Sequence, residues 1–206
     1  MSAATAAASR PQTTAPLGGG RRRGSGSFRH AETLRRAGST QNALAEYARA
    51  IELAPEDAYY RCRYAEALHE MGCTDDAVAQ MERCCVIEPQ SAYYRFRLGE
   101  LHANQGRLGA AISELTAATD LAPDDAYYHV RLGGLYSQVG RPQEAASALV
   151  AAIALSPQNA SYHCLLADAY VRLGADRNAL KHYREAGLLG DYDAAFVAKV
   201  RRMVPF

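Results

Sequence analysis

The sequence predicts an all-α fold, an α-solenoid of about five 34-residue helix-turn-helix repeats. The first observation is the phrase Pro-x-x-Ala-Tyr-Tyr, or a close variant, which begins at Pro55, Pro89, Pro123 and Pro157, at intervals of 34 residues. A fixed period of this length is typical of repeat arrays. The second observation is that small residues recur with the same period, at Gly38, Gly72, Gly106, Gly140 and Gly174 and at Ala43, Ala77, Ala111, Ala145 and Ala179. Glycine makes up only 16 of 206 residues, so this spacing is not a coincidence.

Each repeat is expected to contain two helices, helix A and helix B. We count positions from Ala58, Ala92, Ala126 and Ala160, with a degenerate first copy counted from Gly24. Helix A is predicted over positions 1–14, and glycine at position 15 suits the left-handed residue that ends a helix. Polar side chains that can cap helix A precede it, namely Asp57, Ser91, Asp125 and Asn159. Helix B is predicted over about positions 18–31, with Thr40, Thr74 or Asp176 as caps and a proline at position 32 to end it.

Small residues also recur where the two helices of one repeat are expected to pack. In repeat four these are Gly133 at position 8 and Ala145 at position 20. The apolar stripe of helix A includes Tyr128 at position 3 and Leu132 at position 7, and that of helix B includes Leu149. This spacing places the apolar residues of each helix on one face, where they can form a core.

These residues resemble the tetratricopeptide-repeat (TPR) family. The segment Leu132-Gly133-Gly134-Leu135-Tyr136, followed by Ala145, Leu149 and Pro157, is similar to the family's pattern of Leu-Gly-x-x-Tyr, then Ala-x-x-x-Phe, then Pro. The resemblance covers about residues 27–193. One departure is the absence of the family's tryptophan at position 4, whose space the tyrosines at position 3 are expected to fill. The resemblance implies a stacked helical scaffold without catalytic activity.

The repeat pattern divides the chain into three parts. Residues 1–26 are expected to form a disordered Ala/Ser/Gly/Arg-rich tail, because they have no apolar periodicity. Residues 27–193 are expected to form the TPR-like array, divided into 27–57, 58–91, 92–125, 126–159 and 160–193. An amphipathic segment over 194–206 is expected to be a C-terminal capping helix, which such arrays need for solubility. For the tail, an organellar targeting segment, a polyanion-binding arm at Arg21–Arg23 or a misassigned start are the alternatives.

Composition narrows the class of partner and the compartment. The net charge is +1, but residues 1–36 carry seven arginines against Glu32 alone, so the rest of the chain carries a net charge of −5. This balance gives no general attraction to nucleic acid or to a membrane surface. No apolar run approaches the roughly 18 residues of a membrane span. The five cysteines have no C-x-x-C spacing, which indicates reduced thiols and a cytoplasmic location, with organelle targeting as the minor alternative.

The resemblance also implies where a partner would bind. In a TPR-like array, helix A lines the concave groove, and the corresponding residues at positions 2, 6 and 9 here are Tyr59, Arg63, Glu66, Tyr93, Arg97, Glu100, Tyr127 and Arg131. Tyrosine and arginine are the residue types most favoured at interface hot spots. The alternative is that arginine at position 6 only pairs with glutamate at position 9 of its own helix.

The sequence therefore favours a non-enzymatic scaffold, a monomer or weak oligomer, that binds an unknown protein or peptide segment in this groove. No catalytic residue, metal site or cofactor is expected, because the six histidines lack metal-ligand spacing and the glycines are helix caps rather than a phosphate-binding loop. One alternative is an RNA- or polyanion-binding adaptor that uses the basic N-terminal tail and the Arg/Tyr positions of the groove, although nucleic acid is an unlikely partner. A weaker alternative is the non-catalytic part of a larger enzyme complex.

Overall fold

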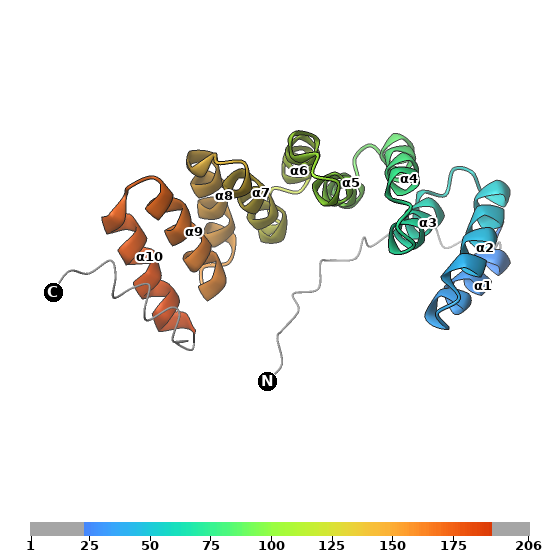
Figure 1. Ribbon diagram of the computed structural model, residues 1–206, viewed down its shortest axis with the longest axis horizontal. Helices are drawn as coiled ribbons and strands as arrows, with labels where there is room; N and C mark the ends of the chain where they lie inside the picture. The colour runs from blue at the N-terminus through green and yellow to red at the C-terminus, as the bar shows by residue number, and fades with distance from the viewer. Residues whose placement is uncertain (1–22, 191–206) are drawn as a thin grey trace. The chain divides into compact units, whose positions relative to one another are not determined.

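The computed structural model describes residues 23–190, which contain ten α-helices and no strand (Figure 1). The helices are α1 (Ser25–Arg36), α2 (Thr40–Leu53), α3 (Ala58–Glu70), α4 (Thr74–Ile87), α5 (Ala92–Asn104), α6 (Leu108–Leu121), α7 (Ala126–Gln138), α8 (Pro142–Leu155), α9 (Ala160–Arg172) and α10 (Asp176–Leu189). The odd-numbered helices are the predicted A helices, and the even-numbered helices are the predicted B helices. The predicted all-α class of helix-turn-helix repeats is confirmed.

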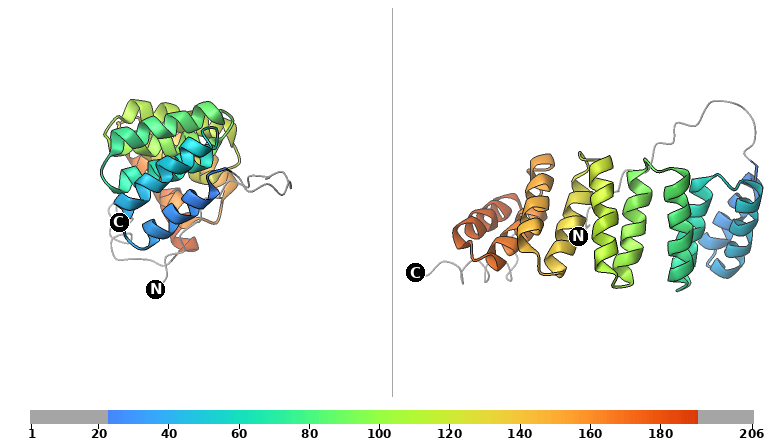
Figure 2. Two further views of the ribbon diagram at one scale, coloured as in Figure 1. Left: turned by 90° about the vertical axis from the view of Figure 1, so that its right-hand side faces the viewer. Right: turned by 90° about the horizontal axis from the view of Figure 1, so that it is seen from above.

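The chain divides into two compact units, which meet between Gly106 and Arg107. Unit 1 contains α1–α5 and unit 2 contains α6–α10. Within each unit every helix packs against the next one along the chain, as the side-by-side rods of Figure 2 show. Helix α1 begins two residues before the predicted boundary of the array. The predicted capping helix over 194–206 and residues 1–22 of the predicted tail lie outside the described residues.

The ends of the A helices follow the sequence pattern closely. The side chains of Asp57, Asp125 and Asn159 accept hydrogen bonds from backbone N–H groups of the first turn, for example Tyr127 N to Asp125 Oδ1 at 2.9 Å. Ser91 makes no such bond. The glycine that follows each A helix adopts the predicted left-handed conformation, with φ between 69° and 81°. Three of the four predicted caps of the A helices are therefore confirmed.

The B helices begin one residue earlier than predicted, so Thr40, Thr74 and Asp176 are their first residues rather than their caps. In the described region, no side chain of a cap residue accepts a hydrogen bond from the first-turn backbone N–H groups of a B helix. In four of these helices the backbone N–H of the cap residue bonds back to the preceding A helix, as from Ser39 to Leu34 O at 2.9 Å and from Cys73 to Leu68 O at 2.9 Å. Together with the left-handed glycine, this bond closes a Schellman turn, after which helix B starts at once.

Small residues and inward-facing tyrosines form the cores of both units. A Cβ atom added to Gly133 would lie 2.9 Å from Leu149 Cγ, so α7 and α8 approach as closely as the position-8 pattern predicts. Ala145 is fully buried on the facing helix. Three of the four position-3 tyrosines are buried, as expected for residues that replace the family's tryptophan, namely Tyr60, Tyr94 and Tyr128, whereas Tyr162 is half-buried.

Position-4 side chains, to which the sequence assigned no role, form hydrogen bonds with the carbonyl oxygen of the proline that begins the Pro-x-x-Ala-Tyr-Tyr phrase. Arg61 Nε donates to Pro55 O at 3.2 Å, while His129 Nε2 and His163 Nε2 lie 3.0 and 3.1 Å from the carbonyls of Pro123 and Pro157. Each bond ties helix A to the loop that precedes it. The position that carries tryptophan in the family therefore carries hydrogen-bond donors here. No helix of residues 23–190 is both long and apolar enough to span a membrane.

Candidate binding surface on the A helices

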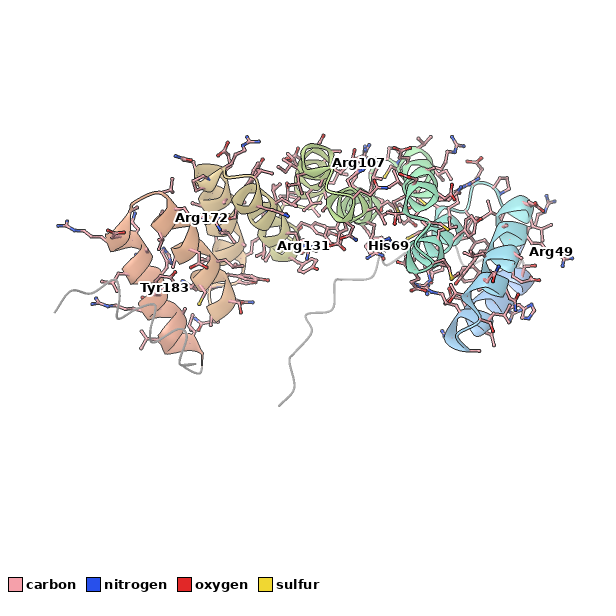
Figure 3. The ribbon with its side chains drawn as sticks, in the orientation of Figure 1. Arg49, His69, Arg107, Arg131, Arg172 and Tyr183 are labelled. Atoms are coloured by element: carbon pink, nitrogen blue, oxygen red, sulfur yellow. The ribbon has the colours of Figure 1, made fainter. Side chains whose placement is uncertain are left out.

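The eight predicted residues lie on three A helices. Three are on α3 (Tyr59, Arg63 and Glu66), three are on α5 (Tyr93, Arg97 and Glu100) and two are on α7 (Tyr127 and Arg131). The first six belong to unit 1, whose third A helix is α1. The last two belong to unit 2, where Figure 3 shows Arg131 on α7 and Arg172 on α9. Within each unit, we call the surface made by positions 2, 6, 9, 12 and 13 of the A helices the A-helix face of that unit.

Glu66 connects the three A helices of unit 1. Its side chain is only 10% exposed, and its two oxygens contact arginines from each of these helices. Arg63 Nη1 lies 2.5 Å from Oε2, Arg35 Nη1 lies 3.4 Å from Oε2, and Arg97 Nη2 lies 3.4 Å from Oε1. The hydroxyl of Tyr93 donates to Oε1 at 3.4 Å. A buried carboxylate requires such partners, because an unpaired charge in this position would be costly.

Two further glutamates complete the partners of these arginines. Arg63 Nε donates to Glu32 Oε1 on α1 at 2.9 Å, and Arg97 Nη1 lies 3.5 Å from Glu100 Oε2 on its own helix. The hydroxyl of Tyr47 donates to the same oxygen of Glu32 at 2.5 Å. Burial alone would raise the pKa of Glu32, but the hydrogen bonds from Arg63 and Tyr47 outweigh it and hold this pKa below its ordinary value. Glu32 is therefore ionised at neutral pH and fixed between α1, α2 and α3.

Arg35 and Glu70 belong to the same network, although the sequence analysis did not select them. Arg35 forms a bidentate pair with Glu70, and this hydrogen bond is the main reason that the pKa of Glu70 is lowered. The two residues are 35 apart and occupy positions 12 and 13 of neighbouring repeats. The same spacing recurs between His69 and Asn104, whose Nε2 and Nδ2 atoms are 3.2 Å apart. Both pairs could have been found by comparing position 12 of each repeat with position 13 of the next repeat, rather than comparing the same position in every repeat.

Both kinds of pairing are therefore present in unit 1. The pairs of Arg63 with Glu66 and of Arg97 with Glu100 lie within one helix, as the alternative reading of the sequence expected. The pairs of Arg63 with Glu32 and of Arg97 with Glu66 join neighbouring helices and were not predicted. The network contains three arginines and four glutamates, so it offers no excess of positive charge. Its arginines are held in fixed positions.

The two position-2 tyrosines of unit 1 differ in exposure. Tyr59 is 41% exposed, with its ring centroid 5.4 Å from that of Phe28 on α1. Tyr93 is half-buried, and burial raises the pKa of its hydroxyl well above the ordinary value. Tyr59 is thus the more accessible of the two for a partner.

The A-helix face of unit 2 has a different chemistry. Tyr127 is half-buried and Arg131 is exposed on α7, while on α9 position 6 carries Leu165. The carboxylate of Asp168 accepts a hydrogen bond from Tyr183 of α10, which Figure 3 labels beneath α9. Arg172 Nη1 donates to Ser137 O on α7 at 2.6 Å, which links the two A helices of this unit.

The described residues give no sign of a metal or nucleophilic site. Within 23–190, no three His, Cys, Asp or Glu side chains are grouped so that they could hold a metal ion. All five cysteines are free. Burial raises the pKa of the Cys62 thiol to about 12, so this thiol is protonated and unreactive at neutral pH. His163 and His182 lie with their Nδ1 atoms 3.1 Å apart, but the second ring nitrogen of His163 is engaged by the backbone of Pro157.

The sequence matches the tetratricopeptide repeat family over residues 28–92, 74–126 and 130–193. These matches cover most of the chain, and with the helix-turn-helix repeats described above they show that the protein belongs to the TPR family. No curated protein matches the sequence.

Solved structures of other TPR proteins share the fold. MamA residues 41 to the end from Desulfovibrio magneticus RS-1 superimposes with a TM-score of 0.71 at 22% identity, over 81% of this chain and 94% of that one. YrrB, described as a TPR protein with an unusual peptide-binding site, gives a TM-score of 0.71 at 18% identity over 85% and 90%. PilF of Pseudomonas aeruginosa gives 0.67 at 17% identity over 87% and 86%. At these identities the likeness concerns the fold alone.

Proposed function

We propose that this protein is a non-enzymatic interaction scaffold that binds a peptide or protein segment on the A-helix face. The observation that carries the proposal is membership of the TPR family combined with tyrosine and arginine at repeated positions of successive A helices. These are the residue types that dominate interface hot spots. The description of YrrB as peptide-binding supports the same class of function.

The ion-pair network gives this face a physical advantage as a binding surface. Arg63 and Arg97 are held by Glu66 and its neighbours, so they lose little side-chain freedom when a partner binds. A guanidinium group has five N–H donors, and these pairs occupy only some of them. The side chains of Arg63 and Arg97 are 26% and 29% exposed, so a partner can reach them as well as the exposed ring of Tyr59.

We further propose a cytoplasmic monomer or weak oligomer that needs no cofactor. The five free thiols support a reducing compartment. The RNA- or polyanion-binding alternative is less favoured, because Arg63 and Arg97, the position-6 arginines that would contact phosphates in unit 1, already form ion pairs with glutamates. A polyanion binder would lose affinity steeply as salt is raised. Titration of single-stranded RNA at increasing salt concentrations would test this alternative directly.

The proposal is tested by capturing partners with a tagged full-length chain, identifying them by mass spectrometry and measuring direct binding of a purified partner segment. A variant that combines Tyr59→Ala with Arg131→Ala changes one accessible side chain of the A-helix face in each unit. We expect this variant to lose binding while keeping its helicity. Arg63 and Arg97 are poorer choices, because their removal would take away two of the three arginine partners of Glu66.

The matched control combines Val86→Ser with Val150→Ser, which changes one exposed side chain on a B helix of each unit. The control should bind the partner segment as the wild type does. If the A-helix variant binds normally, or if the control loses binding equally, the proposed surface is wrong.

A further inference from the structure

The ion pair between position 6 of one A helix and position 9 of the preceding A helix is absent between α7 and α9 of unit 2. In unit 1 the residue at position 6 of an A helix contacts the residue at position 9 of the preceding A helix, as Arg63 contacts Glu32 and Arg97 contacts Glu66. In unit 2 the corresponding residues are Leu165 on α9 and Gly134 on α7. Both partners of the ion pair are therefore missing at the same place.

Gly134 has no structural reason to be glycine. It is the ninth of 13 residues of α7, and it is exposed. Apart from its two chain neighbours and the adjacent backbone of α7, a Cβ atom added there would have no atom within 4 Å, whereas one added to the neighbouring Gly133 would lie 2.9 Å from Leu149 Cγ. Glycine in the middle of a helix is destabilising relative to alanine. Packing within the fold therefore does not require this glycine, and its lack of a side chain leaves the surface of α7 open at this position.

An apolar side chain lies beside this open position. Leu165 on α9 is 40% exposed, although leucine is more commonly buried. Helices α7 and α9 are in contact, and the bond from Arg172 to Ser137 O fixes them beside each other. By the register of unit 1, Leu165 faces Gly134. An uncharged pair, one residue of which is apolar, thus stands where unit 1 has an ion pair.

The charges around this uncharged pair have one predominant sign. The A helices of unit 2 carry Arg131 and Arg172 and a single carboxylate, Asp168, which is bonded to Tyr183. Figure 3 shows both arginines on the same two helices as the pair. A partner that places a carboxylate beside its apolar side chain would be complementary to this surface.

We propose that α7 and α9 form a site for one aliphatic side chain of a partner peptide, which enters over Gly134 against Leu165, with an acidic residue next to it in the peptide. This inference rests on the proposed peptide-binding function and narrows it to a place and a partner chemistry. The missing side chain at position 9 lets the peptide approach the helix closely. The unit 1 network cannot offer such a site, since Glu32 and Glu66 fill the same position there.

The test begins with a library of random linear peptides displayed on phage and selected against the full-length chain. The enriched peptides should share an aliphatic residue next to aspartate or glutamate. One enriched peptide is then synthesised with a fluorescent label, and its Kd is measured by anisotropy.

The variants restore residues that the chain itself uses at these positions, so the fold is expected to tolerate them. Gly134→Glu fills the open position, Leu165→Arg removes the apolar wall, and the double variant recreates the ion pair seen between Glu32 and Arg63. Each should weaken the peptide by at least about tenfold, the cost of losing one buried aliphatic side chain. Val150→Arg, an equally exposed apolar position on α8, should change Kd by less than about twofold.

The outcomes separate the two proposals. If peptides are enriched and bind the Gly134→Glu and Leu165→Arg variants as tightly as the wild type, while the Tyr59→Ala variant loses them, this inference is wrong and the peptide-binding function stands. If no peptide is enriched by the wild-type chain, both are overturned. Enrichment of aliphatic-acidic peptides whose binding both variants weaken supports the site.

Discussion

Glu66 illustrates how one residue can organise several helices. Its half-buried carboxylate accepts contacts from Arg35, Arg63 and Arg97, one on each of the three A helices of unit 1. In the outer repeats the corresponding acids, Glu32 and Asp168, instead accept a tyrosine hydroxyl from their own helix B. Glu66 has no such tyrosine partner from its own helix B, where Met81 occupies that position, so its oxygens are available to neighbouring repeats.

Replacing Glu66 tests this role. Glu66→Gln should destabilise unit 1 by about 1.5–3 kcal/mol, because three guanidinium groups lose a charged acceptor in a half-buried position. Urea unfolding followed by circular dichroism would measure the change. Glu70→Gln is the matched control, and since its side chain is 48% exposed we expect a loss of about 0–1 kcal/mol. Equal losses for the two variants would contradict the central role of Glu66.

The adjacent glycines of α7 make a second prediction at the residue scale. Gly133→Ala should destabilise the protein by about 1–3 kcal/mol, because its Cβ would overlap Leu149. Gly134→Ala should stabilise it by about 0.5–1 kcal/mol, since the new methyl group meets nothing and the helix becomes more favourable. Thermal unfolding of the wild type and both variants under one set of conditions would measure these changes in stability. A loss of stability in Gly134→Ala would show that this glycine serves the fold.

At the scale of elements, the sequence specified the helices better than the contacts between them. The prolines, glycines and alanines that recur every 34 residues predicted the ten helices of residues 23–190, because each of these residues indicates where a helix ends or packs. The starts of the B helices were misplaced by one residue, because the cap was sought in a side chain while the Schellman turn supplies a backbone bond.

The candidate surface was only partly predictable for a similar reason. The pair of Arg63 with Glu66 follows from spacing within one helix, but the contact of Arg63 with Glu32 depends on how neighbouring repeats are offset. That offset is a property of the stacked units. Gly134 and Leu165 occupy the positions that Glu32 and Arg63 occupy in unit 1. This correspondence between two positions of neighbouring repeats depends on the same offset.

The packing of α9 on α10 should depend on pH. Burial, and then the nearby charges of His163 and Lys181, lower the pKa of His182, while Glu185 opposes them weakly. The unfolded chain therefore takes up a proton more readily than the folded one. The stability from this contact is fully present above the ordinary histidine pKa of about 6.5 and is lost as the pH falls through the lower folded value.

Hydrogen exchange in α9 and α10, corrected for the intrinsic effect of pH, should show faster opening at about pH 5.5 than at about pH 7.5. His182→Gln keeps a donor for His163 but cannot titrate, so the effect should shrink in that variant. If the two proteins respond to pH alike, the histidine pair does not cause the dependence.

At the scale of the whole molecule, the chain combines an invariant framework with a changing surface. The same glycine turns and proline phrases recur along the described repeats, whereas the A-helix face changes from an ion-pair network in unit 1 to an apolar, basic surface in unit 2. Repetition of the framework gives the fold, and variation on one face can give selectivity for a partner.

The most direct test of a binding function on the A helices is hydrogen exchange of the full-length chain with and without its bound partner segment. We predict slower exchange in α3, α5, α7 and α9, with the largest change near Gly134 and Leu165, and little change in the B helices. Slower exchange confined to the B helices, or no change in any helix, would contradict binding on this face.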